Sequence, residues 1–408
     1  MSWKIEHPCP QCGAPVELEE TDRIFTCEFC RNRLYISPRE TFQFFLAKEQ
    51  PGPELYFLPY WRFKGMAFSC DELQVTGKIV DSNILAMTLP HAPPSLGLRP
   101  QVLKLRYASP EVPGRFIKPE HLLAPATACG CSSCAAGHMP ALFVGEIKSL
   151  IYSPVSVRGD WLFDAILDRP MCQLNDGALE GPKTDEDLRV EDQISFFATL
   201  CPQCGFDLEG EKNSLVLLCR HCGSLWQARN SGFENVPCDF IATRGRGDEA
   251  DMYLPFWSIS ADVSGLPIGS HAELVRLANL PQLAQAAWEN EAPHFATPAF
   301  KVHPSLFLRL TRMMTFLRNN PVRSSEPPKP PLYPVSLPLN EALESLRPFL
   351  ASIAHPKKSV LPHLLDMAFS LKDARLVYLP FTLRGEELIQ QEIGMSVQKA
   401  ALSWGKLI

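Results

Sequence analysis

The chain lacks several features that would narrow its function at once. None of its apolar runs approaches the roughly 18–20 residues that a helix needs to cross a bilayer. The N-terminal residues lead directly into a cysteine motif, with no apolar segment of the kind that directs secretion. We therefore expect no membrane span and no export from the cell.

The chain also lacks an excess of positive charge. Its 39 Lys and Arg residues are outnumbered by 45 Asp and Glu residues, which gives a net charge of −6. A protein that grips the phosphate backbone of nucleic acids usually carries a basic patch or a high isoelectric point. The composition therefore does not favour nucleic acid as the partner, although it leaves this partner open.

Common catalytic motifs are missing as well. The sequence contains no G-x-x-x-x-G-K-[ST] phosphate loop, no G-x-G-x-x-G, no H-E-x-x-H and no G-x-S-x-G. We therefore expect no catalytic residues and lean towards a non-enzymatic protein, with the question of an activity left open.

Cysteine, by contrast, is abundant and regularly spaced. Eight of the 14 cysteines form two copies of C-x2-C-x14-C-x2-C, placed 192 residues apart. Two thiolates on one tight turn and two on another provide the four soft ligands of a closed Zn2+ site. The predicted ligands are Cys9, Cys12, Cys27 and Cys30 for one site, and Cys201, Cys204, Cys219 and Cys222 for the other.

The two cysteine motifs carry a resemblance to a known class of module. Residues 7–36 and 199–228 resemble zinc ribbons of the transcription-factor type, which implies a small three-stranded β fold held by structural zinc. The whole chain, with its Leu58-Pro-Tyr-Trp61 block, resembles uncharacterised bacterial proteins that contain two such ribbons. This second resemblance implies no particular activity.

Sequence blocks outside the cysteine motifs also recur. Pro59-Tyr-Trp61 corresponds to Pro255-Phe-Trp257, and Ile151–Gly159 resembles Val377–Gly385. The order of the blocks is the same in both halves, while the spacing between them drifts as insertions in loops would cause. The pattern predicts a tandem duplication in which each ribbon precedes a β-rich unit.

The predicted fold class is α+β and β-dominated, with two tandem homologous halves. We expect strands at residues 42–46, 55–68, 73–80, 102–107 and 143–157, and again at 239–243, 252–263, 306–311 and 375–383. The expected domains are ribbon 1 (1–37), β-rich unit 1 (38–175), an acidic linker (176–194), ribbon 2 (195–230) and β-rich unit 2 (231–408). Helical insertions are expected within the last unit at 270–291 and 340–371, the latter including a helix over 361–371.

A further cysteine cluster lies outside the repeat. Cys129, Cys131 and Cys134, followed by His138, form a possible third metal site, with Cys172 as an alternative fourth ligand. The same thiols could hold an iron–sulfur cluster or form a redox pair, whereas a flexible loop of small residues is the simpler interpretation.

Three functional hypotheses follow. The first is a zinc-stabilised, non-enzymatic adaptor or assembly protein that binds protein partners. The second is a nucleic-acid-binding protein of transcription or replication, and the third a redox or metal-dependent enzyme that uses the Cys129 cluster. Because thiolate ligands require a reducing compartment, we expect the protein in the cytoplasm.

Overall fold

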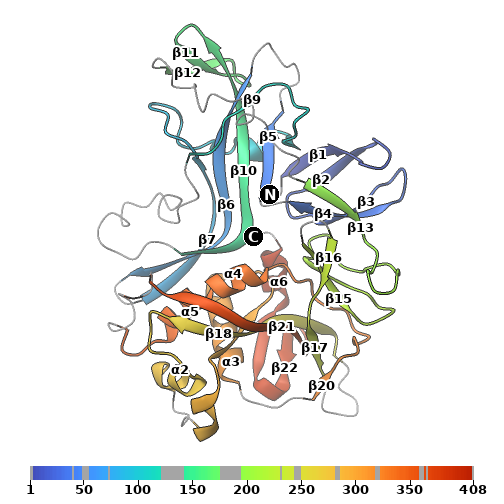
Figure 1. Ribbon diagram of the computed structural model, residues 1–408, viewed down its shortest axis with the longest axis vertical. Coiled ribbons are helices and arrows are strands. Elements are labelled where there is room, and N and C mark those ends of the chain that lie inside the picture. The colour runs from blue at the N-terminus through green and yellow to red at the C-terminus, as the bar shows by residue number, and fades with distance from the viewer. Residues whose placement is uncertain are drawn as a thin grey trace.

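The computed structural model describes most of the chain in a β-dominated α+β fold (Figure 1). The described residues are 3–38, 41–47, 55–71, 74–120, 142–174, 194–229, 232–242, 250–280, 285–317, 322–357, 363 and 366–406. Within these residues, no helix has both the length and the apolar character that crossing a membrane requires.

The first half is built on a ten-stranded sheet. Its central path runs β12-β11-β10-β5-β8-β1-β2, and the long strand β6 joins it by pairing with β10, β7 and β9. The strands are β1 (Lys4–Pro8), β2 (Pro15–Glu19), β5 (Phe42–Leu46), β6 (Tyr56–Asp71), β7 (Gln74–Leu85), β8 (Leu105–Tyr107), β9 (Arg115–Phe116), β10 (Leu142–Arg158), β11 (Trp161–Asp164) and β12 (Arg169–Gln173).

The second half contains a seven-stranded sheet and most of the helices. Its path is β19-β18-β21-β17-β20, with β22 added to β21 and β23 to β22. The strands are β17 (Cys238–Ile241), β18 (Met252–Ser264), β19 (His294–Pro298), β20 (Arg323–Ser324), β21 (Ala368–Arg384), β22 (Glu387–Gln390) and β23 (Met395–Gln398). The helices of the described chain are α1 (Arg99–Val102), α2 (His271–Leu277), η3 (Ala286–Asn290), α3 (Pro304–Phe316), α4 (Leu339–Glu344), α5 (Leu346–Ile353), η6 (Gln391–Ile393) and α6 (Lys399–Gly405).

Two small sheets belong to the cysteine-rich segments. One contains β13 (Ile194–Ala198), β4 (Arg33–Pro38) and β3 (Ile24–Thr26), in that order. The other contains β14 (Val216–Leu218), β15 (Leu225–Arg229) and β16 (Gly232–Asn235). Figure 1 shows both on the same side of the molecule, beside the junction of the two halves.

The recurring sequence blocks occupy the same places in the two large sheets. Tyr60 is opposite Ile151, and its counterpart Phe256 is opposite Val377, in antiparallel pairs of the same register. A β-bulge interrupts each pair at the equivalent point, beyond Lys64 in β6 and Ser260 in β18. This strand pair therefore has the same register and the same position of an irregularity in both halves.

The halves are joined through one hydrophobic core. Met66, Phe68 and Val144 of the first sheet are buried in the cluster that contains the helices of the second half. Glu341, at the start of α4, accepts hydrogen bonds from the amide of Gly145 and from Lys148 Nζ, both at 2.9 Å. Because a buried carboxylate needs such donors, these contacts fix α4 against the bulged part of β10.

Buried charges fix the first cysteine-rich segment to the long hairpin of β6 and β7. Glu20 accepts from Arg62 and, at 2.6 Å, from Lys64 Nζ. Arg62 is fully buried, also forms two 2.9 Å hydrogen bonds with Asp81, and stacks over the Trp3 ring. The side chains satisfy one another, as buried ions must.

Two expectations about secondary structure are wrong. Residues 306–311 are not a strand but part of α3, because Phe307, Leu310 and Thr311 recur at the spacing of a buried helix face. Within the helical insertion expected at 340–371, α5 ends at Ile353, and residues 368–371 belong to β21 because they pair with Ala261–Ser264 of β18. Most of 361–367 and nearly all of the acidic linker lie outside the described residues.

Most of the remaining expected strands and the insertion at 270–291 are confirmed in position. Ser270 caps α2 with the reciprocal capping box that its sequence indicates, and η3 follows. Strands β5, β6, β7, β10, β17, β18 and β21 overlap the expected ranges, whereas residues 99–102 form α1 and β8 is correspondingly short. The domain division itself stays a prediction, since β1 of the first ribbon also pairs with β8 beyond residue 37.

Candidate metal centres

Each cysteine motif folds into two knuckles with the same backbone hydrogen bonds. In the first knuckle the amide of Cys9 donates to Ala14 O at 2.7 Å, and the amide of Gly13 donates to Cys9 O at 2.8 Å. The other three knuckles repeat this pattern of backbone amides that donate to backbone carbonyls. The donor and acceptor residues are Cys27 to Asn32 and Arg31 to Cys27 in the second knuckle, Cys201 to Phe206 and Gly205 to Cys201 in the third, and Cys219 to Ser224 and Gly223 to Cys219 in the fourth. The local sequence therefore places both sulfurs of each C-x2-C on one turn.

The residue after each second cysteine adopts a left-handed conformation. Gly13, Gly205 and Gly223 have φ between 73° and 76°, as the sequence indicates for a knuckle that turns backbone amides towards sulfur. In the remaining knuckle this position is Arg31, with φ of 58°. A side chain there has a conformational cost that glycine does not have.

The four sulfurs of each motif converge. Within each set all Sγ atoms lie within 4.8 Å of one another. The closest pairs are 3.8 Å (Cys9–Cys30) and 3.7 Å (Cys12–Cys27) in the first set, and 3.7 Å (Cys201–Cys222) and 3.4 Å (Cys204–Cys219) in the second. A tetrahedral Zn2+ with Zn–S bonds of about 2.3 Å requires sulfurs about 3.8 Å apart.

The donor set fits a closed, structural metal ion. Four thiolates suit Zn2+ and also suit iron, and they leave no coordination position for water or substrate. The first cysteine of each knuckle is buried, namely Cys9, Cys27, Cys201 and Cys219. Both predicted sets of ligands are thus brought together, in the arrangement that a zinc ribbon requires.

In each site hydrogen bonds to sulfur lower the pKa of at least one thiol, whereas burial and contact with the neighbouring sulfurs raise the pKa of Cys12 to about 11 and that of Cys204 to about 12. In the first site, backbone hydrogen bonds from Cys30 and Phe29 lower the pKa of Cys27 to about 7. In the second, Ser224 Oγ lies 2.9 Å from Cys222 Sγ and lowers the pKa of Cys222 to about 6. Ser224 in turn accepts from Trp226 Nε1 at 2.7 Å.

Ser224 was not recognised from the sequence. It lies two residues beyond the last ligand, where the first ribbon has Asn32. Because the two ribbon sequences differ at this position, comparing them did not point to a residue near the metal site. The apolar side chains four residues beyond the last ligand of each ribbon are buried: Leu34 is 4% exposed and Trp226 is 9% exposed. A polar group that orients a metal ligand is typical of the surroundings of metal sites.

The two ribbons are joined to each other, which the sequence did not reveal. Strand β13, just before Cys201, pairs antiparallel with β4 of the first ribbon over Ile194–Ala198. Arg33 donates to the carbonyls of Leu208 at 3.0 Å and Gly210 at 2.9 Å. The carbonyl of Lys212 accepts from the amides of Arg23 and Ile24.

Apolar side chains complete this joint. Ile24 and Tyr35 of the first ribbon are buried in one cluster with Leu208, Leu217 and Trp226 of the second. Since a ribbon of about 30 residues buries little apolar surface by itself, each module contributes to the stability of the other.

Cys129, Cys131, Cys134 and His138 lie outside the described residues, so a third metal site stays a prediction. Cys172, considered as its fourth ligand, is buried in β12 within the apolar core of the first half. In the described part of the chain, the only groups of three or more potential ligands are the two cysteine sets.

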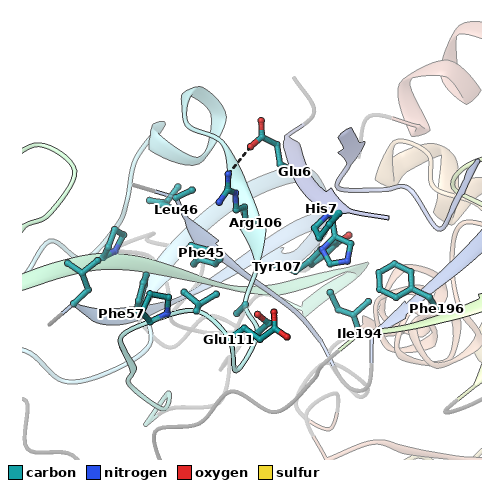
Figure 2. A pocket seen from close by; sticks show the side chains of 18 residues that line it. Glu6, His7, Phe45, Leu46, Phe57, Arg106, Tyr107, Glu111, Ile194 and Phe196 are labelled. Atoms are coloured by element: carbon teal, nitrogen blue, oxygen red, sulfur yellow. Dashed lines mark hydrogen bonds and ion pairs between the residues drawn. The ribbon is translucent and has the colours of Figure 1, made fainter. Parts of the chain in front are cut away.

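A cavity of about 580 Å³ lies between the first ribbon, its β-rich unit and β13 (Figure 2). Phe45 and Phe57 line one side, and His7 stacks on Phe196 at the other, with ring centroids 5.1 Å apart. Burial raises the pKa of Tyr107 and lowers that of His7, so both rings are neutral near pH 7. Its size and its apolar lining are typical of ligand pockets.

Comparisons with protein-family models, with curated proteins and with solved structures found no match to this chain.

Proposed function

We propose that this chain is a zinc-binding, non-enzymatic adaptor or assembly protein that acts through protein–protein contacts. The observation that carries the proposal is that eight cysteines form two closed four-thiol sites within one joined pair of ribbons. Metal in such sites holds a surface in shape and leaves no position for catalysis. Zn2+ is the metal that this donor set and the spacing of its sulfurs suit best.

We also infer that the two halves arose by tandem duplication and that the protein works in the cytoplasm. The equal register and the equivalent bulges in the two large sheets support the duplication. Uncrosslinked thiolate ligands support a reducing compartment. The expected division into two ribbons, two β-rich units and an acidic linker belongs to the same proposal.

Apolar side chains exposed on the knuckles support a role in binding protein. Phe29 is 69% exposed and Phe206 is 55% exposed, and Phe206 stacks on His221 with ring centroids 3.8 Å apart. Leu200, beside the second site, is 49% exposed. Exposed aromatic side chains on a rigid support are characteristic of interface hot spots.

The test uses the intact, metal-loaded protein as bait in extracts of its native host. We expect it to retain a specific protein partner, and the double variant Phe29→Ser, Phe206→Ser to lose that partner while keeping two zinc ions. The control is Val102→Ser, a still more exposed apolar site (81% exposed) away from the ribbons. Absence of any protein that distinguishes wild type from the double variant would contradict the proposal.

Nucleic acid is the second candidate, and the exposed Phe206–His221 stack is the observation that favours it. A base can stack on such a pair, and Arg220 is adjacent, although it is paired with Glu209 at 2.9 Å. A gel-shift series across salt concentrations separates the two candidates. Tight binding with a steep salt dependence would favour nucleic acid over a protein partner.

The third hypothesis, a redox or metal-dependent enzyme using Cys129, Cys131 and Cys134, is tested by metal analysis. Two zinc ions per chain fit the adaptor, a third adds a site, and coloured iron favours redox chemistry. Replacing the three cysteines by serine without loss of metal or partner would remove this hypothesis.

A further inference from the structure

Strand β13 is at the edge of its sheet and directs part of its backbone away from that sheet. Within the described chain, β13 pairs only with β4. The amide of Ile36 on β4 donates to Arg23 O at 2.7 Å, so it points towards β3. In antiparallel strands, the backbone N–H and C=O groups of two paired residues either both point towards the partner strand or both point away from it. Phe196 is paired with Ile36, so its amide and carbonyl point away from β4. The same alternation directs the amide of Ile194 outwards.

The cavity lies on one face of β13, next to this edge. Ile194 and Phe196, two of the residues with outward amides, both line it. Figure 2 shows their side chains on one side of the cavity and those of Phe45 and Phe57 on the other. An edge strand beside an apolar cavity provides the two elements of strand addition, in which backbone hydrogen bonds give affinity and pockets for alternate side chains give specificity.

One carboxylate of the cavity wall has no ion pair in the described part of the chain, although the wall as a whole is not negative. At the rim Glu6 pairs with Arg106 at 3.3 Å and with Lys104, and this group keeps one positive charge. Glu111 is exposed, and no ion pair is formed by its carboxylate within the described residues. Figure 2 shows this carboxylate between the aromatic side and the Ile194 side.

We propose that an extended segment of a partner protein binds here by adding a strand to β13, placing an apolar side chain in the cavity and a basic side chain near Glu111. The proposal rests on the adaptor function and names the kind of partner segment. Side chains of a strand point alternately to its two faces. An apolar and a basic residue of the partner segment can therefore reach the cavity and Glu111, either from adjacent positions on opposite faces or from alternate positions on one face.

The test uses three fluorescein-labelled octapeptides, Ser-Val-X-Phe-X-Val-X-Gly, with X as Lys, Ser or Glu. Anisotropy titrations with the metal-loaded, full-length protein should rank them Lys, Ser, Glu from tightest to weakest. A peptide of the same composition as the Lys version, with its apolar residues grouped instead of alternating, should bind more weakly at the same salt concentration. Equal binding of the grouped peptide would overturn strand addition.

Two variants separate the backbone contact from the charge. Ile194→Pro removes an outward amide that β4 does not use, and should weaken all peptides by about tenfold, the effect of roughly one hydrogen bond. Its matched control, Ile194→Val, keeps the amide and should bind like wild type. Glu111→Gln should weaken the Lys peptide by about threefold, as for an exposed ion pair, and leave the Ser peptide unchanged.

The remaining outcomes also decide the proposal. Zinc content and melting temperature are measured for every variant, and loss of binding counts only where both are unchanged. Glu111→Gln changes only an exposed side chain, so it tests the proposal even where Ile194→Pro disturbs the fold. Self-association that Ile194→Pro abolishes, measured by sedimentation, would assign the edge to a second copy and overturn the proposal. Binding of a partner only through Phe29 and Phe206, with all octapeptides inactive, would overturn it while leaving the adaptor function standing.

Discussion

The two ribbons have the same internal design but different supports. All four knuckles repeat one pattern of hydrogen bonds, and each ribbon gathers four sulfurs. The first ribbon, however, places β1 in the ten-stranded sheet and is fixed by the buried Glu20–Arg62–Lys64 group. The corresponding strand of the second ribbon, β13, pairs with the first ribbon instead.

This difference shows how similar modules come to depend on each other. The residues of β18 that correspond to Arg62 and Lys64 are Ser258 and Ser260, so the ionic anchor exists only in the first half. Ser258 instead forms a 2.8 Å hydrogen bond with His294 Nε2. The second ribbon therefore obtains support from the first, through β13 and the contacts of Arg33.

The largest expected effect tests whether the two metal sites are independent. We predict that Cys219→Ser abolishes zinc binding at the second site and also weakens the first, because β13 and the acceptors of Arg33 lose their fixed position. Zinc binding contributes on the order of 10 kcal/mol to the folding of such small modules. Metal content and chelator competition measure both effects; a first site with wild-type affinity would show that the ribbons are independent.

The buried anchor should be the next largest contribution. Glu20→Ala leaves Arg62 and Lys64 buried without their shared carboxylate, and should lower the free energy of unfolding by about 3–5 kcal/mol. In the other half, Ser258→Ala, at the position that corresponds to Arg62, should cost about 1 kcal/mol, the value of an ordinary hydrogen bond. Urea unfolding measures both, and equal losses would mean that the anchor does not distinguish the halves.

The hydrogen bonds between the ribbons should have an intermediate effect. Arg33→Ala removes two charge-assisted bonds to Leu208 and Gly210, and we expect a loss of about 2 kcal/mol together with faster zinc release from the second site. Arg229→Ala, which removes only the exposed pair with Glu234 on the neighbouring strand β16, is the control and should have little effect. Release rates that are the same in both variants would contradict this coupling.

The smallest expected effect concerns the one knuckle without glycine. Arg31→Gly should stabilise the first ribbon by about 1 kcal/mol, because glycine adopts its left-handed conformation without a Cβ penalty. The converse change, Gly13→Ala, should cost a similar amount, since no atom lies within 4 Å of the added Cβ and only the backbone strain acts. Thermal unfolding of the two variants should therefore shift in opposite directions.

The accuracy of the sequence-based expectations varied with the kind of signal. The alternating or continuous apolar runs of β5, β6, β10 and β18 gave strands at the right places. The segment at 306–311 was mistaken for a strand because a short run of Leu and Phe fits either period, and only burial on one helix face distinguishes them. The two four-cysteine sets come together as their spacing predicts, because that spacing is itself the requirement of such a site.

By itself, the sequence determined the two four-cysteine sites and the glycine turns that form them. Each knuckle depends on residues three to five positions apart, where covalent geometry leaves few arrangements, and only 14 residues separate the two knuckles of a site. Only the tertiary structure decided that β13 joins the first ribbon, that Glu20 is shared by two buried cations, and that His7 and Phe196 close a cavity. These contacts join residues tens to hundreds of positions apart, and the free energy that selects them comes from burial and pairing in the folded chain, which no local pattern contains.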